Sequence, residues 1–382
     1  MTDNWSLNID RGFINAVVFL DLKKAFDTVD HTILLSKLQA YGIQGSTNQW
    51  FCSYLKNRTQ TCLVNGNKSS KMFLRCGVPQ GTILGPLLFL LYINDLPNCL
   101  QHSQPRMYAD DTSITFAGND VDEMNNCINL DLEGIRVWLA ANKLTLNMTK
   151  TEFLLIGSKQ RLLKSTAKPT ATINEVPIKQ VSTVKSLGVH IDENLTWECH
   201  VNELSKKIAS GISAIKHIRH TVPYKTLLTI YNSLVQPHFD YCSSVWGSYS
   251  KSLSQKLQKL QNRAARVITF SNYDRSTDEL LQMVNWAKMD RQRLVDKSIM
   301  MYKTVNRMAP DYLSSNFVFR SDTLTYNLRE SDFSLAIPQP RTNYYKRSLS
   351  YSGAVLWNGL PLDIRQSPSL NVFKSKLKNC DF

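Results

Sequence analysis

Three carboxylates occupy positions from which they could hold divalent metal ions. Asp21 directly follows the apolar run 16–20 (AVVFL), and Asp110-Asp111 lie within an alternating segment typical of a β-hairpin. Carboxylates at strand ends are held by the sheet yet exposed at its edge, and Mg²⁺ prefers oxygen ligands. Two ions roughly 3.5–4 Å apart could clamp the attacking and leaving oxygens of a phosphoryl transfer. The alternative for an isolated Asp-Asp pair is a solvated turn without chemistry.

The residues around Asp21 predict the elements that position it. The apolar run 16–20 is typical of a buried strand, and a turn over 23–27 follows it. Asp30 is a suitable N-cap for the next helix, and Gly42 is a suitable terminator. The apolar face of that helix is expected to consist of Ile33, Leu34, Leu38 and Tyr41.

The segment around Asp110-Asp111 predicts the rest of an α+β fold. A second helix is expected to end before Pro97, with its core face made of Leu84, Leu87, Leu88 and Leu91. Residues 107–117 predict a hairpin whose turn is Asp110-Asp111. A helix over 121–142 then precedes a strand at 153–156. This order predicts an antiparallel sheet backed by helices.

Downstream of about residue 200 the pattern becomes mostly helical. Helices are expected at 202–220, 223–235, 251–269 and 277–308. Residues 310–382 are rich in Ser, Asn, Tyr and Pro, which predicts a loosely structured C-terminal region. We therefore expect three parts, 1–200, 201–309 and 310–382.

Composition narrows the class of partner. The net charge of +14 favours a polyanion, either nucleic acid or an anionic membrane surface. The longest apolar stretch, 83–93, is interrupted by Gly85-Pro86 and is too short to span a bilayer, and no signal peptide is evident. The eight cysteines include no CxxC pair, which argues against a zinc module or a disulfide framework. Nucleic acid is therefore the favoured partner.

Five segments together resemble the motifs of a reverse transcriptase. FLDLKKAFDTVDH (19–31) resembles motif A, GVPQGTILGP (77–86) motif B and YADD (108–111) motif C. NMTKTE (147–152) is similar to motif D, and SLGVHID (186–192) to the motif E region. All five occur in the family's order over residues 15–195. Their residue sequences are most similar to those of enzymes from non-LTR (LINE-type, jockey- or CR1-like) retrotransposons. The resemblance implies a polymerase palm, followed by a thumb-like helical region.

The resemblance also implies a two-metal mechanism. Asp21, Asp110 and Asp111, helped by the backbone carbonyl of Leu22, match the residues that bind two Mg²⁺ ions, with Mn²⁺ as a possible substitute. The reaction would join a deoxynucleoside triphosphate to the 3′-hydroxyl of a DNA primer on an RNA template. A remote alternative, a nucleotidyl cyclase on a similar palm, is disfavoured by the motif B loop and the YADD turn.

Three further residues match substrate-binding positions, and Lys150 matches a catalytic one. Phe26 would exclude a ribose 2′-hydroxyl, or else be a plain core aromatic. Gln80 and Gly81, at the expected start of the motif B helix, would contact the nucleotide, the alternative being a plain helix-start loop. Lys150 would donate a proton to pyrophosphate, or be an ordinary exposed lysine. Asp27, Asp30 and His31 are expected to be structural.

One downstream helix predicts a nucleic-acid contact. Its basic arc consists of Lys256, Lys259, Arg263 and Arg266, and its neighbouring apolar arc of Leu257, Leu260, Ala264 and Val267. A thumb that grips a phosphate backbone has this pattern, although a solvated charged face has it too.

About 15 residues precede the motif A strand, so we expect the fingers region to be missing and the chain to be N-terminally truncated. We expect the upstream endonuclease of such elements to be missing as well. The alternative function is therefore a catalytically inactive remnant that only binds nucleic acid. The family implies cytoplasmic assembly and nuclear action. The residues do not indicate the oligomeric state, the template RNA or the target site.

Overall fold

The computed structural model describes residues 1–164, 169–323 and 333–380, which form two compact units. We call Phe13–Leu187 the sheet unit, and Met1–Gly12 together with Gly188–Phe382 the helical unit. Boundaries were expected near 200 and 310, but the units meet at Leu187 and Gly188, and residues on both sides of 310 belong to the helical unit. The mixed α+β class is confirmed.

The sheet unit contains motifs A to D and the first two residues of motif E. Its elements are β1 (Ile14–Leu20), η1 (Ala25–Asp27), α2 (His31–Ala40), α3 (Gly45–Leu55), β2 (Thr59–Gln60), β3 (Leu63–Val64), β4 (Asn67–Lys68), β5 (Met72–Phe73), α4 (Leu84–Ile93), η2 (Leu96–Cys99), β6 (Gln104–Tyr108), β7 (Asp111–Gly118), α5 (Val121–Ala141), β8 (Glu152–Ile156), α6 (Lys159–Lys164), β9 (Thr172–Ile173), β10 (Val176–Pro177), β11 (Lys179–Gln180) and β12 (Thr183–Ser186).

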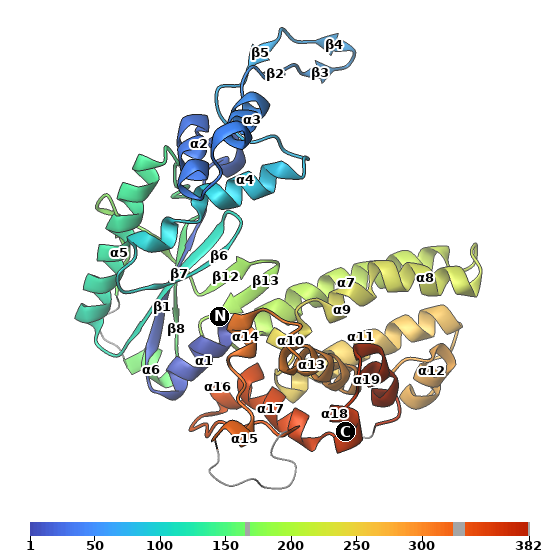
Figure 1. Ribbon diagram of the computed structural model, residues 1–382. Helices are drawn as coiled ribbons and strands as arrows, with labels where there is room; N and C mark the ends of the chain where they lie inside the picture. Colours follow the sequence, from blue (N-terminus) through green and yellow to red (C-terminus); the bar gives the residue numbers. More distant parts are fainter. Residues whose placement is uncertain (165–168, 324–332, 381–382) are drawn as a thin grey trace. The chain divides into compact units, whose positions relative to one another are not determined.

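The main sheet has the strand order β11-β8-β1-β7-β6, so the motif A strand β1 lies at its centre (Figure 1). β1 pairs antiparallel with both β7 and β8, and β7 with β6, whereas the short β11 runs parallel to β8. Central placement explains the continuous apolar run, because β1 is buried on both faces. The expected antiparallel palm sheet is therefore present.

Helix α5 packs on one face of this sheet. Alternate β1 residues, among them Ala16 and Val18, join the core together with Met124, Ile128, Leu132, Ile135 and Leu139 of α5. These α5 residues recur at the three- and four-residue spacing of one helix face. Asp120 caps the helix by accepting a hydrogen bond from the Glu123 N–H.

The buried carboxylate of Asp131, also on α5, holds the segment that leads into β6. It accepts hydrogen bonds from the backbone N–H groups of Gln101, His102 and Ser103 at 2.5–3.3 Å. A carboxylate that is 1 % exposed is tolerated because these donors satisfy it. The start of the motif C hairpin is thereby attached to the helix behind the sheet.

Several local predictions for the sheet unit are confirmed and two are wrong. Asp30 caps α2, and Gly42 ends it with φ of +87°. Tyr41 and Leu87 were expected in the core, but they are 41 % and 49 % exposed. On α4 the buried positions are instead Gly85, Leu88, Phe89, Tyr92 and Ile93. A helix that is apolar all round does not reveal its buried face.

The helical unit begins with the N-terminal helix and resumes after motif D. Its elements are α1 (Thr2–Asp10), β13 (Val189–Asp192), α7 (Glu198–Ile218), α8 (Tyr224–Leu234), α9 (Gln236–Asp240), α10 (Ser243–Trp246), α11 (Lys251–Thr269), α12 (Thr277–Val284), α13 (Met289–Val305), α14 (Asp311–Ser314), α15 (Arg320–Thr323), α16 (Asn343–Lys346), α17 (Leu349–Gly359), α18 (Leu362–Arg365) and α19 (Leu370–Leu377).

Two predictions for this unit are wrong. The helix expected over 277–308 is two helices, α12 and α13, because Asn285 ends α12 in the left-handed region with φ of +55°. The region from 310 was expected to be loosely structured, but α17 and α19 pack with α13 in a core. Its largest members are Trp357, Phe373 and Tyr302.

Two carboxylates of α1 hold this C-terminal region. Asp10 accepts hydrogen bonds from the Arg341 and Thr342 N–H groups and from the Thr342 hydroxyl. Asp3 accepts from the N–H groups of Leu349 and Ser350 at the start of α17. Carboxylates are stabilising at helix N-termini, where backbone N–H groups lack partners. Among the described residues, no helix is both long and apolar enough to cross a membrane.

Candidate active site

The register of the central strands brings the three expected carboxylates together. Leu20 of β1 pairs with Thr112 of β7, so the same register carried one residue further places Asp21 opposite Asp111. Burial, followed by the charges of Asp110 and Asp21, raises the pKa of Asp111 above its ordinary value. Charges raise a carboxyl pKa in this way only when they lie close to it, so the three carboxylates are near one another.

The turn that carries Asp110 differs from the expected one by a residue. Tyr108 pairs with Asp111, so the two loop residues are Ala109 and Asp110, and Asp111 is already the first residue of β7. Ala109 takes the left-handed conformation with φ of +52°. An L-residue with a β-carbon rarely adopts that region, so the tight turn stores strain next to the carboxylates.

The motif D segment holds Asp21 in place. The Asn147 side-chain amide donates to Oδ2 of Asp21 at 2.9 Å, and the Asn147 backbone N–H donates to the Asp21 carbonyl at 2.7 Å. The hydroxyl of the buried Thr151 accepts from the Asp21 N–H at 3.3 Å. Asp21 is thus bound through its side chain and through both of its backbone groups.

The same contacts orient the carbonyl of Leu22. Leu22 forms an antiparallel bridge with Leu146. The two hydrogen bonds of this bridge are made by flanking residues: the Lys23 N–H donates to the Thr145 carbonyl, and the Asn147 N–H donates to the Asp21 carbonyl. In this kind of antiparallel pair, the N–H and carbonyl of the paired residue itself point away from the opposite segment. The Leu22 carbonyl therefore makes no hydrogen bond to residues 145–147.

The motif B loop packs directly on the motif A turn. The Gly77 N–H donates to the Val29 carbonyl and the Val78 N–H to the Phe26 carbonyl, each at 2.8 Å. A β-carbon on Gly77, which has φ of +91°, would lie 2.8 Å from the Asp27 carbonyl oxygen. Glycine is required at this position both by the backbone conformation and by the close approach.

Gln80 and Gly81 lie in this loop, three to four residues before α4 begins at Leu84, so they do not open the helix as expected. Gln80 is exposed, and its amide donates to the Asp27 carboxylate at 2.8 Å. Gly81 has φ of +79°, and no heavy atom lies within 4 Å of the position that a β-carbon would take there. Space for a ligand therefore remains beside Gly81.

Phe26 is half-buried and stacks on Phe89 of α4, with ring centroids 4.4 Å apart. The aromatic pair attaches the motif A turn to the motif B helix. His31 also belongs to this junction, because its Nε2 lies 2.8 Å from the Gly77 carbonyl oxygen. The structural role expected for His31 agrees with this contact.

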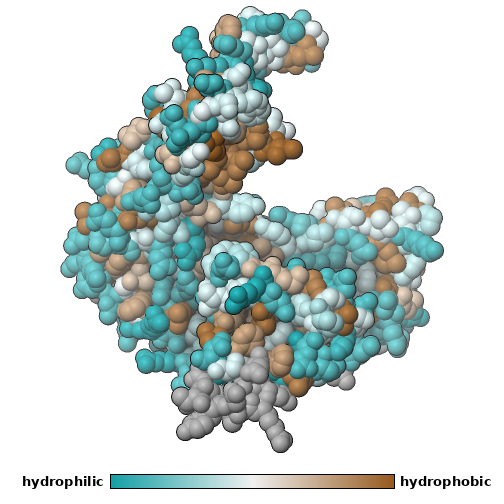
Figure 2. Space-filling model, in the orientation of Figure 1, coloured by the Kyte–Doolittle hydropathy of each residue, from teal (hydrophilic) through white to brown (hydrophobic). Residues whose placement is uncertain are grey.

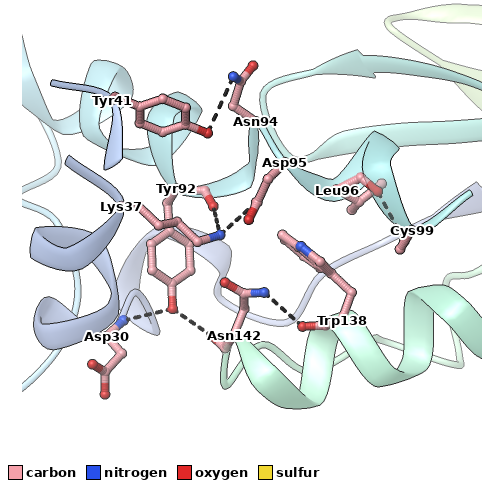
Figure 3. A network of polar contacts seen from close by, with 10 residues as sticks. All are labelled: Asp30, Lys37, Tyr41, Tyr92, Asn94, Asp95, Leu96, Cys99, Trp138 and Asn142. Carbon is pink, nitrogen blue, oxygen red and sulfur yellow. Dashed lines mark hydrogen bonds and ion pairs between the residues drawn. The ribbon is translucent and has the colours of Figure 1, made fainter. Parts of the chain in front are cut away.

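A polar network behind the turn supports it (Figure 3). The Tyr92 hydroxyl donates to the Asn142 carbonyl at 2.6 Å and accepts from the Asp30 N–H at 3.4 Å. Lys37 donates to the Tyr92 carbonyl and to the Asp95 carboxylate, each at 2.6 Å. Burial raises the pKa of Tyr92 to about 12 and lowers that of Lys37. These contacts join α2, α4 and the end of α5 behind the motif A turn.

The remaining predicted residues are Lys150 of the sheet unit and four residues of α11. Lys150 is exposed in the turn that follows Asn147. In the helical unit, Lys256, Lys259 and Arg263 of α11 are exposed, as a phosphate-binding stripe requires. Arg266 is half-buried, with its guanidinium over the Tyr273 ring, and therefore does not belong to the open stripe. The apolar arc of α11 is confirmed, with Leu257, Ala264 and Val267 buried.

The carboxylates suit a hard divalent cation chemically, although they are not a closed metal cage. Among the described residues, no group of three or more His, Cys, Asp or Glu side chains is arranged to hold an ion. Asp21, Asp110 and Asp111 nevertheless offer oxygens, the ligands that Mg²⁺ prefers, and Mg²⁺ usually completes its coordination with water and substrate. After burial, their mutual repulsion contributes to the raised pKa of Asp111, and a bound cation would relieve that repulsion.

Sequence reasoning overlooked two residues that hold Asp21. Asn147 and Thr151 were recognised only as part of motif D, without a role of their own. The signal that could have found them is position, because both lie just before β8, the strand that pairs with β1. Tyr92 was overlooked for a different reason, since an apolar helix gives no indication of where its hydroxyl points.

Comparison with known proteins agrees with this geometry. Residues 9–191 match the family model described as "Reverse transcriptase (RNA-dependent DNA polymerase)". The chain carries a reverse transcriptase domain. That domain contains all five motif segments except the last residue of the fifth, and the resemblance inferred from the motifs is confirmed.

The relatives that this chain resembles come from mobile elements. The "Probable RNA-directed DNA polymerase from transposon BS" of Drosophila melanogaster is 30% identical over 69% of this chain and 30% of its own length. That from transposon X-element of the same fly is 29% identical over 66% and 28%. The "RNA-directed DNA polymerase from mobile element jockey" of Drosophila funebris is 26% identical over the same shares. The chain thus spans about 30% of the length of these relatives.

Proposed function

We propose that this protein is an RNA-directed DNA polymerase of a non-LTR retrotransposon, which extends a DNA primer on an RNA template with deoxynucleoside triphosphates. The observation that carries the proposal is the register that brings Asp21 to the Asp110-Asp111 turn inside a reverse transcriptase domain. The names of its relatives support the same activity. Cytoplasmic assembly and nuclear action are part of this proposal.

Asp21, Asp110, Asp111 and the Leu22 carbonyl would hold two Mg²⁺ ions, or Mn²⁺ in their place. When bound, these ions would activate the primer 3′-hydroxyl and neutralise charge on the pyrophosphate leaving group. Asn147 orients the Asp21 carboxylate for this task. Substituting a residue that orients a metal ligand commonly lowers activity about 10- to 100-fold.

The other site residues act on the nucleotide. Phe26, held by its stack on Phe89, would exclude a 2′-hydroxyl sterically. Gln80 and Gly81 would contact the sugar or the triphosphate from the open motif B loop. Lys150 would donate a proton to the departing pyrophosphate. Lys256, Lys259 and Arg263 would contact phosphates of the template–primer duplex, whereas Arg266 is held over the Tyr273 ring.

The test is primer extension on poly(rA)–oligo(dT) with Mg²⁺ or Mn²⁺, comparing the wild type with Asp110→Asn. Incorporation by the wild type that the substitution abolishes supports the polymerase. If both proteins bind the duplex equally and neither extends it, the protein is a nucleic-acid-binding remnant and the proposal is wrong. Thermal denaturation of both proteins shows whether the substitution has also changed the fold.

A further inference from the structure

A long hairpin between motifs A and B carries charged side chains that are all positive. From His31 to Asn94 the sequence contains no Asp or Glu, but it contains six Lys or Arg residues. Five of the six lie in the segment 56–76: Lys56, Arg58, Lys68, Lys71 and Arg75. The segment 56–76 thus carries five cations and no anion, whereas an ordinary solvated surface carries charges of both signs. Such a segment is suited to a polyanion.

The hairpin projects from the end of α3, and the rest of the sheet unit leaves it uncovered (Figure 1). Its outer ladder pairs β3 with β4 around an Asn65-Gly66 turn, whose φ angles of +49° and +82° are those of a type I′ turn. Its inner ladder pairs β2 with β5. All eight strand residues are exposed, so the hairpin contributes nothing to the core.

Large apolar side chains lie among the charges. Phe73 is 71 % exposed, and its neighbour Met72 is 67 % exposed. Hydrophilic and hydrophobic surface alternate along the hairpin in Figure 2. Exposed aromatic rings interleaved with cations are typical of surfaces that bind single strands, because unpaired bases stack on rings while Lys and Arg neutralise phosphates. A docking surface for protein would not require the exclusion of every anion.

A stack of side chains connects the hairpin to the candidate active site. Trp50 and Tyr54 of α3 stack at 5.6 Å with their rings 9° apart, and the Arg58 guanidinium lies over the Tyr54 ring at 5.5 Å. The Tyr54 hydroxyl lies 3.3 Å from the Thr82 hydroxyl, which in turn donates to the Pro79 carbonyl at 2.8 Å. The base of the hairpin is therefore fixed to the motif B loop.

From these observations we propose that the hairpin 56–76, together with Trp50, binds single-stranded nucleic acid. Lys68, Lys71 and Arg75 contact consecutive phosphates, while Phe73 stacks on a base. The motif B loop adjoins the hairpin, so the bound strand is the unpaired RNA template near the site. That identification of the strand rests on the proposed function, whereas binding of a single strand does not.

The test is fluorescence anisotropy with a labelled, unstructured 20-nucleotide RNA, a DNA of the same sequence, and the corresponding duplex. The variant Lys68→Ala/Lys71→Ala/Arg75→Ala is expected to weaken RNA binding about tenfold or more. The dependence of log K on log salt should become shallower by about 2, since each phosphate contact on a single strand contributes about 0.7. Phe73→Ala should weaken binding roughly five- to tenfold, and Phe73→Tyr should not.

The matched control removes three exposed cations elsewhere in the same unit, with Lys159→Ala/Arg161→Ala/Lys164→Ala on α6. Equal losses in the two triple variants would mean general electrostatic attraction and would overturn the proposal. A larger loss of duplex binding than of RNA binding in the hairpin variant would also overturn it, as would self-association of the wild type that Phe73→Ala removes. A preference for the DNA strand would overturn the assignment to the template.

Asp110→Asn separates this inference from the proposed function. The variant should bind the RNA like the wild type, because Asp110 lies outside the hairpin. If no protein extends primers but the hairpin variants still lose RNA binding, the proposed polymerase fails and the hairpin site stands. If the wild type extends primers and the hairpin variants bind RNA normally, the hairpin proposal alone is wrong.

Discussion

The side-chain amide of Asn147 donates a 2.9 Å hydrogen bond to the carboxylate of Asp21, although 126 residues separate them in the sequence. The Thr149 hydroxyl donates to the other side-chain atom, Oδ1 of Asn147, at 2.7 Å and so fixes the orientation of the amide. The metal-binding candidate of motif A is thus oriented by motif D. Motifs A and D therefore form one coupled arrangement.

Asn147→Ala is expected to lower primer extension about 10- to 100-fold, because Asp21 loses the donor that orients it. Asn147→Asp should lower it further, since it places a negative charge beside the carboxylate. Steady-state incorporation on poly(rA)–oligo(dT) measures both. The exposed Asn119, replaced by Ala, is the control and should retain full activity. Wild-type rates for Asn147→Ala would contradict the positioning role.

Phe26→Val is expected to admit ribonucleotides by removing the ring that would meet the 2′-hydroxyl. Phe89→Leu should have a smaller effect in the same direction, because Phe26 would lose its stacking partner 4.4 Å away. The ratio of incorporation efficiencies for deoxy- and ribonucleotides measures the change. If Phe26→Val lowered stability and left this ratio unaltered, Phe26 would be a core aromatic without a role in selection.

Gly85→Ala is expected to lower the free energy of unfolding of the sheet unit by about 1–3 kcal/mol. The added methyl group would lie 2.3 Å from the Pro79 carbonyl oxygen, which is backbone and cannot move aside without shifting the motif B loop. Urea denaturation measures the loss. Leu87→Ala on the same helix is the control and should be milder, because Leu87 is half exposed.

The stability of the helical unit is expected to fall with acidification because of His200. Burial, followed by the charges of His190, Lys207 and Arg293, lowers the pKa of His200 to about 4. The folded state therefore favours the neutral ring, and the resulting stabilisation is present above the unfolded pKa of about 6.5 and lost as pH falls toward 4. The expected loss is at most about 3 kcal/mol.

His200→Phe should flatten this dependence, since the new ring can still pack against Trp246, which lies 4.9 Å from the imidazole. Denaturation midpoints between pH 4 and pH 7.5 give the comparison. His217→Phe, at an exposed position on the same helix, should retain the wild-type slope. Equal slopes for wild type and His200→Phe would show that His200 does not govern the acid response.

Asp10→Ala is expected to destabilise the helical unit by about 1–3 kcal/mol, because three donors at Arg341 and Thr342 lose their acceptor. Denaturation followed by tryptophan fluorescence would report the loss, since Trp5 and Trp357 are both buried in this unit. Asp311→Ala, at an exposed helix start in the same unit, serves as the control. An unchanged midpoint for Asp10→Ala would contradict the role of α1 in holding the C-terminal region.

Much of the fold was predictable from the sequence wherever periodicity was unambiguous. The apolar run of β1, the Asp30 cap and the bounds of α11 were all expected, because each depends on neighbouring residues. Prediction failed on α4, where every face is apolar and only packing selects the buried one. It failed again on the C-terminal region, whose polar composition concealed a core built around Trp357 and Phe373.

The sequence by itself identified Asp21, Asp110 and Asp111 as metal-binding candidates, because the segments around them resemble motifs A and C of a reverse transcriptase. The tertiary structure alone decided how that site is held. Strand register brings Asp21 to Asp111, Asn147 orients Asp21, and Tyr54 connects the basic hairpin to the motif B loop. The physical reason is that motifs are local, whereas these hydrogen bonds and pairings join residues far apart in the chain, whose proximity only folding establishes.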